Sequence, residues 1–180
     1  RRRLLGSGWQ RGRDQQHHGE QGPKGAAGSG ERAHGDLRWA GDVEAAIDWL
    51  RTRHGDKAKI GICGHAEGGL TALYTAVCDV RVDAALVSGY FNTRQEVWAE
   101  PIYRNVWALV HEFGDAEIAG LIAPRSLVIE AAAAPEVAGP PAPRPGRSAG
   151  AAPGRIAVPV LAEVKREYAR AAAIYEKLKA

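Results

Sequence analysis

The chain has 180 residues, of which 45% are hydrophobic and 25% are charged, and its formal net charge is +3. This composition is typical of a soluble globular protein and not of a disordered chain. No apolar run approaches the roughly 20 residues that a membrane-spanning helix needs. We therefore expect a soluble domain with no membrane partner.

The first part of the chain differs from the rest. Residues 1–38 contain nine glycines and carry eight basic against four acidic side chains, with little apolar periodicity. Such a segment buries too little surface to offset the entropy of ordering it, so we expect it to be flexible or irregular. Trp9 is the one aromatic residue among its charges. Because nucleic-acid binding favours a basic face on a folded element, we expect no nucleic-acid partner.

The start of the chain and its cysteines leave the compartment open. Residue 1 is arginine and the chain has no methionine, which indicates a processed chain or a fragment. The segment 1–5 has positive charge but no apolar stretch of signal-peptide length. Cys63 and Cys78 lie at opposite ends of a predicted helix, about 15 Å apart, too far for a disulfide.

Regular structure is predicted from about residue 39 to residue 180, as a single domain. Val43, Ala46, Ile47 and Leu50 recur at helical spacing after a possible cap at Asp42. Cationic residues and a glycine follow, as is usual at a helix C-terminus. The spacing predicts a helix that ends near residue 55.

The next stretch, Lys59–Leu70, holds the pattern on which the functional hypothesis depends. Ile60, Ile62 and Cys63 predict a buried strand, and Leu70–Val77 predicts a helix. Between them, residues 64–68 read Gly-His-Ala-Glu-Gly. This matches G-x-S-x-G, a tight strand-to-helix turn that exposes its central side chain, except that the central residue is alanine.

The residues after this turn predict a second strand and a pocket. Ala84–Ser88 is an apolar run, and a helical connection requires it to lie parallel to the first strand. Ligands of open α/β sheets bind beyond the carboxyl ends of the strands. We therefore expect Tyr90, Phe91 and Asn92 to line a pocket together with Ala66.

The segment 96–114 is rich in aromatic residues, including Trp98. It is interpreted either as a surface helix that packs its aromatics on the sheet or as a substrate-binding cap, with Trp98 as a candidate ligand contact. His111 precedes a glutamate in this segment and is expected to be an ordinary surface or core histidine.

The remainder of the chain predicts a helix, a third strand, a long loop and a final helix. The helix covers residues 115–122 and the strand covers Ser126–Glu130. Residues 131–159 hold seven of the ten prolines and are predicted to form an irregular, extended loop. Residues 160–180 repeat apolar side chains at three and four residues, which predicts an amphipathic helix covering the sheet, with partner binding as the alternative.

Together these features resemble the α/β-hydrolase superfamily, on its dienelactone-hydrolase-like and acetyl-xylan-esterase-like side. The similar residues span about 42–156 and include the turn at 64–69, the strand at 84–90 and the segment 122–129. The resemblance implies a partial parallel sheet flanked by helices and a small ester as substrate. It also implies that a full hydrolase has further strands before the turn and a histidine after the last strand.

The resemblance further implies residue roles. Ala66 occupies the position of the nucleophile serine, and the backbone N–H of Glu67 would stabilise the oxyanion. Glu130 and Glu136 are alternative triad acids, and His65 is a further candidate for ligand binding. No cofactor and no metal ion are expected.

Two hypotheses follow from the alanine at position 66. In the first, the chain is an ester-hydrolase scaffold that is inactive because an alanine methyl cannot attack a carbonyl carbon. In the second, it is a non-catalytic pseudo-hydrolase that binds a ligand or has a structural role.

Overall fold

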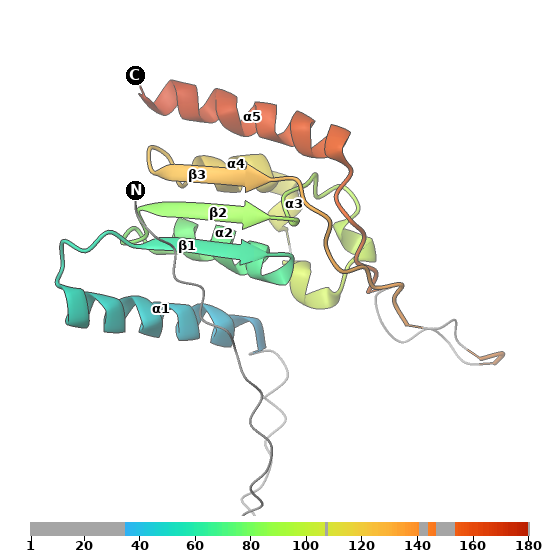
Figure 1. Cartoon of the computed structure of the whole chain (residues 1–180). Helices are drawn as coiled ribbons and strands as arrows, with labels where there is room; N and C mark the ends of the chain where they lie inside the picture. The colour runs from blue at the N-terminus through green and yellow to red at the C-terminus, as the bar shows by residue number, and fades with distance from the viewer. Residues whose placement is uncertain (1–34, 107, 141–143, 147–153, 180) are drawn as a thin grey trace, which may run out of the picture. The chain divides into compact units, whose positions relative to one another are not determined.

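The fold is mixed α/β, with a parallel sheet flanked by helices, and so confirms the fold class expected from the sequence. In the computed structural model, residues 35–106, 108–140, 144–146 and 154–179 are described. Three strands, β1 (Gly61–His65), β2 (Ala84–Ser88) and β3 (Ser126–Glu130), pair in parallel in that order (Figure 1).

The register aligns the carboxyl ends of the three strands. His65 pairs with Ser88, and Ser88 pairs with Glu130. The segments that follow each strand therefore leave the sheet at one edge. The candidate functional site lies at this edge, where ligands of open α/β sheets bind.

Helices cover one face of the sheet. Helix α2 (Glu67–Cys78) packs on β1 and β2, and helix α4 (Asp115–Gly120) packs on α2 and on α5 (Leu161–Lys179). Figure 1 shows α2 and α4 behind the sheet. No described helix is long and apolar enough to span a bilayer.

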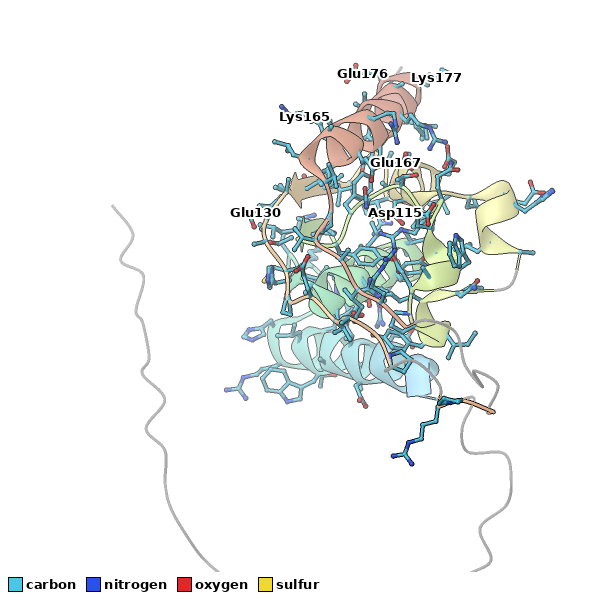
Figure 2. The ribbon with its side chains drawn as sticks, turned by 90° about the vertical axis from the view of Figure 1, so that its right-hand side faces the viewer. Asp115, Glu130, Lys165, Glu167, Glu176 and Lys177 are labelled. Carbon is cyan, nitrogen blue, oxygen red and sulfur yellow. The ribbon has the colours of Figure 1, made fainter. Side chains whose placement is uncertain are left out.

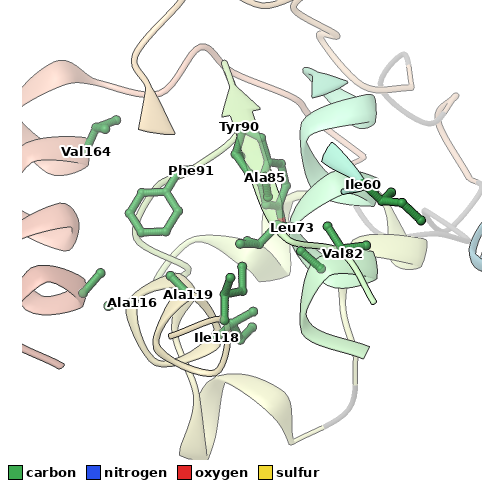
Figure 3. Packing of buried hydrophobic residues seen from close by; sticks show 14 of the residues in the cluster. Ile60, Leu73, Val82, Ala85, Tyr90, Phe91, Ala116, Ile118, Ala119 and Val164 are labelled. Carbon is green, nitrogen blue, oxygen red and sulfur yellow. The ribbon is translucent and has the colours of Figure 1, made fainter. Parts of the chain in front are cut away.

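The hydrophobic core lies between the sheet and these helices (Figure 3). Leu73 of α2, Val87 of β2 and Phe91 are almost completely buried. On the other face of the sheet, Leu86 and Val128 are exposed by 37% and 55%. Strand residues alternate between the two faces, so this difference indicates that the described residues cover only one face.

Two predicted elements, the first helix and the aromatic segment, differ from those observed. Helix α1 spans Gly35–His54 and thus begins seven residues before the expected cap at Asp42. Leu37, Arg38 and Ala40 are good helix formers, which favours a helix that begins before Asp42. A single glycine, Gly41, is tolerated inside it. The segment 1–38 was expected to be flexible or irregular. Its residues 35–38 belong to α1, and its residues 1–34 lie outside the described residues.

The aromatic segment forms short turns of helix instead of one surface helix. It contains the 3₁₀ helices η1 (Val97–Ala99) and η2 (Ile102–Arg104), followed by α3 (Leu109–Glu112). Pro101 has no N–H to donate and separates the two 3₁₀ helices.

The described part of the 131–159 loop contains no helix and no strand longer than an isolated bridge. It holds one antiparallel bridge, in which Val137 and Ile156 exchange hydrogen bonds of 2.9 and 2.8 Å. The N–H of Arg155 also donates to the carbonyl of Ala99, at 2.8 Å. These bonds hold the loop beside η1, beyond the carboxyl ends of the strands.

Candidate functional site

The turn between β1 and α2 is a strained bend centred on Ala66. Ala66 has φ 55° and ψ −117°, a conformation that residues other than glycine seldom adopt. Its N–H donates to the carbonyl of Ser88 at 2.9 Å, and its carbonyl accepts from Gly69 and Leu70. These bonds join the bend to β2 and to the first turn of α2.

Gly64 makes this bend possible. A Cβ atom at position 64 would lie 1.8 Å from the carbonyl oxygen of Gly68, so no larger residue fits. At Gly68, by contrast, a Cβ would meet no atom within 4 Å. The end of the strand approaches the start of the helix so closely at position 64 that only glycine fits there. Position 68 has room for a larger residue.

The bend opens onto a cavity of about 280 Å³. Its wall comes from the bend, from the residues after β2, from η2 and from the 131–159 loop. The lining residues are Ala66, Glu67, Gly89, Tyr90, Asn92, Arg94, Glu100, Tyr103, Arg104, Ala134, Pro135, Val137, Ile156, Ala157 and Pro159. Three of the residues predicted to share a pocket, Ala66, Tyr90 and Asn92, thus meet here.

A chain of alternating charges runs along one side of the cavity. Arg104 forms ion pairs with Glu67 and, at 3.2 Å, with Glu100. Arg94 then contacts both Glu100 and Asp115 at 3.2 Å. The side chains of Arg94, Arg104 and Asp115 are 5%, 7% and 0% exposed, so these charges are held away from water and depend on one another.

Both guanidinium groups contact the ring of Tyr90. The Arg94 and Arg104 Cζ atoms lie 4.6 and 5.5 Å from the centre of its ring, which gives two cation–π contacts. Burial raises the pKa of the Tyr90 hydroxyl well above its ordinary value, so the phenol stays neutral. Tyr90 therefore serves as a rigid aromatic wall.

Asp115 anchors the inner end of the charge chain. Burial raises its pKa to about 6, although Arg94 and a 3.0 Å hydrogen bond from the Asn92 N–H favour the ionised form. Glu167 of α5 accepts from the N–H of Ala116 nearby, and Figure 2 shows Asp115 and Glu167 close together. The negative charge of Glu167 raises the Asp115 pKa further.

His65 is held at the carboxyl edge of the sheet but does not line the cavity. Its Nδ1 lies 3.1 Å from the hydroxyl oxygen of Ser88, the neighbouring residue in register. Its ring also packs against Gly89, where a Cβ would lie 3.1 Å from the His65 Cε1 atom. Gly89 has φ 63°, which likewise favours glycine.

Several other candidate residues lie outside the cavity lining. Phe91 is 1% exposed and belongs to the core. Trp98 is 60% exposed on η1 and does not line the cavity. Glu130 ends β3 as an exposed residue, and Glu136 is an exposed loop residue whose carboxylate lies 3.4 Å from the Val158 N–H.

No histidine in the described part of the chain lines the cavity. His54 lies in α1, His65 contacts Ser88, and His111 is an exposed residue 2.8 Å from the Glu112 carboxylate. The described residues also contain no group of three or more side chains suited to hold a metal ion. The described residues that line the cavity beside the bend thus include no serine, threonine, cysteine or histidine.

Sequence reasoning missed the charged side of the cavity. Glu100 and Arg104 are four residues apart, a spacing that favours an ion pair on a helix. The aromatic residues around them instead indicated a hydrophobic contact at Trp98. Arg94 carried no local signal, because its partner Asp115 lies 21 residues further along the chain. The loop residues that close the cavity depend on the bridge between Val137 and Ile156, which no local pattern predicts.

Comparison with known proteins finds no matching family model and no significantly similar curated protein.

Proposed function

We propose that this chain is a hydrolase-type scaffold of the kind found in carboxylic-ester hydrolases, which binds a small ester or related carbonyl ligand without hydrolysing it. The observation that carries the proposal is the backbone of Ala66, at φ 55° and ψ −117°, between a parallel strand and a helix at the wall of a cavity. Strained residues of this kind occur at functional sites, where the surrounding structure enforces them.

The bend supplies hydrogen-bond donors for a carbonyl oxygen. Glu67 begins α2 and lines the cavity, and the first N–H groups of a helix have no partner within it. The N-terminus of a helix also carries a partial positive charge. A ligand carbonyl beside the Ala66 methyl would accept a hydrogen bond from this end of α2.

The described residues of the same site lack the serine nucleophile and the histidine base of a serine ester hydrolase. A methyl group has no lone pair with which to attack the acyl carbon. No described histidine lines the cavity to serve as a general base. The proposal is therefore binding without turnover, which favours the pseudo-hydrolase hypothesis over that of an ester-hydrolase scaffold inactivated by Ala66 alone.

Binding and turnover can be measured separately. We expect methyl benzoate, titrated into the ¹⁵N-labelled chain, to shift the amide signals of Glu67, Gly68 and Tyr90 in a saturable way. We expect p-nitrophenyl acetate to be hydrolysed no faster than in buffer with equimolar free histidine. Rapid turnover by the natural chain would contradict the proposal, and so would the absence of any saturable shift.

The variant Ala66→Ser adds a hydroxyl group at the same backbone position. Without a base in the cavity we expect it to remain at least about 10³-fold slower than a complete serine hydrolase, since the nucleophile and its base act as a unit. The matched control Ala134→Ser places a hydroxyl elsewhere in the cavity lining. Fast turnover by Ala66→Ser alone would show that a histidine reaches the site and would restore the first hypothesis.

A further inference from the structure

The charges that line the cavity are already paired with one another. Arg104 is bound by Glu67 and Glu100, and Arg94 is bound by Glu100, by Asp115 and by the carbonyl of Tyr90 at 3.0 Å. To bind a ligand carboxylate, either guanidinium would have to release a carboxylate of the protein.

The balance of charge adds a direct repulsion. Glu67 and Glu100 both line the cavity together with Arg94 and Arg104, and Asp115 lies behind them. At neutral pH three carboxylates thus oppose two guanidinium groups in this charge chain. The N-terminus of α2 attracts negative charge, but with only about half an elementary charge, which does not outweigh the ionised carboxylates.

Burial makes this arrangement effective. The side chains of Arg94 and Arg104 are 5% and 7% exposed, so water screens them poorly. Electrostatic interactions at such sites are several times stronger than in bulk water. An anion entering the cavity would lose the free energy of its hydration and gain no unpaired cation in return. An uncharged ligand would lose much less hydration free energy.

We propose that the paired charge chain Glu67–Arg104–Glu100–Arg94–Asp115 makes the cavity selective for uncharged esters and related carbonyl compounds over carboxylate anions. The inference rests on the proposed function and identifies the class of ligand. Glu67 is the residue that sets this selectivity most directly. It lines the cavity and, at 33%, it is the most exposed of the three carboxylates in this charge chain.

The test compares two probes that share one ring, methyl benzoate and benzoate, by titration of the ¹⁵N-labelled chain at low ionic strength and pH 7.5. We expect benzoate to bind at least about ten-fold more weakly than methyl benzoate. In Glu67→Gln, one negative charge is removed and Arg104 is partly released. We expect this substitution to strengthen benzoate binding about ten-fold relative to methyl benzoate binding, measured as the ratio of the two affinities.

Glu96→Gln is the matched control, because Glu96 is an exposed glutamate outside the cavity lining, just before η1. It should leave both affinities unchanged. Equal binding of the two probes to the natural chain would overturn the inference and leave the proposed function standing. A Glu67→Gln variant that folds but does not alter the ratio of the two affinities would overturn it too. Absence of binding by either probe would contradict the proposed function, and the inference with it.

Discussion

The cavity has two walls that are held in place by different means. The elbow wall, residues 64–69 and 90–104, is fixed by a close backbone approach and by buried ion pairs. The loop wall, residues 134–137 and 156–159, is held mainly by the bridge between Val137 and Ile156. The elbow wall is thus dictated by steric and electrostatic requirements, whereas the loop wall depends on a few exposed hydrogen bonds.

The largest effect is expected at Gly64, in the elbow wall. Gly64→Ala would place a Cβ atom 1.8 Å from the Gly68 carbonyl oxygen, which the bend cannot accommodate. We expect a loss of more than about 4 kcal/mol in unfolding free energy, or failure to fold, because overpacking would displace backbone. Urea denaturation measures the change.

Gly68→Ala is the matched control for this substitution. Its Cβ would meet open space within the first turn of α2, so we expect a change between zero and a gain of about 1 kcal/mol. Similar losses for the two variants would show that the bend does not have the geometry described.

The next effect concerns Asp115, which anchors the charge chain of the elbow wall. Its pKa is about 6 in the folded chain against an ordinary value of 3.8, so the folded state binds a proton more tightly than the unfolded state. The associated stability is fully present below pH 3.8 and is lost as the pH rises through about 6. Relative to Asp115→Asn, the natural chain should lose about 2–3 kcal/mol between pH 3.5 and 7.5.

Denaturation of both proteins at several pH values measures this difference. Comparison with the variant subtracts the titration of all other groups from the pH dependence. A constant difference across the range would mean that Asp115 has the same proton affinity in the folded and unfolded chains.

A smaller effect is expected at the bend itself. Ala66 adopts a positive φ, and such strain costs about 1–3 kcal/mol in a residue with a Cβ. Ala66→Gly should therefore raise the unfolding free energy by about 1 kcal/mol, after the extra entropy of glycine in the unfolded chain is subtracted. Thermal and urea denaturation would detect this gain, and a destabilised variant would argue against strain at position 66.

The smallest effect concerns the loop wall, whose amide hydrogens should exchange faster than those of the sheet. We expect the amides of Val137 and Ile156 to exchange at least about 100-fold faster than that of Val87 in the central strand, because the bridge can open without unfolding the sheet. Protection of Val137 equal to that of Val87 would remove the distinction between the two walls.

The sequence alone predicted those elements whose residue pattern is local. The ranges Ala84–Ser88 and Ser126–Glu130 are strands as predicted, and the parallel pairing follows from the helices that connect them. The glycines around Ala66 indicated the turn. Phe91 could not be assigned to the core, since two adjacent aromatic residues give no sign of which one faces the cavity.

The charged part of the site required the structure. The pair formed by Arg94 and Asp115 joins segments that are distant along the chain, and its position depends on how α4 packs against the residues after β2. The loop wall likewise forms through a bridge across about 20 residues. Contacts of this kind are set by tertiary packing and leave no periodic pattern in the sequence.

The central claim, that the bend presents the side chain of residue 66 to the cavity, is tested most directly by Ala66→Cys in a chain whose Cys63 and Cys78 are replaced by alanine. A thiol at a helix N-terminus has a lowered pKa and needs no base to attack an ester. We predict that p-nitrophenyl acetate acylates this thiol once per chain, about ten-fold faster than Cys63 in a chain that retains only that cysteine, and that methyl benzoate slows the reaction. A thiol at position 66 that reacts no faster than Cys63 and is not protected by methyl benzoate would contradict the claim.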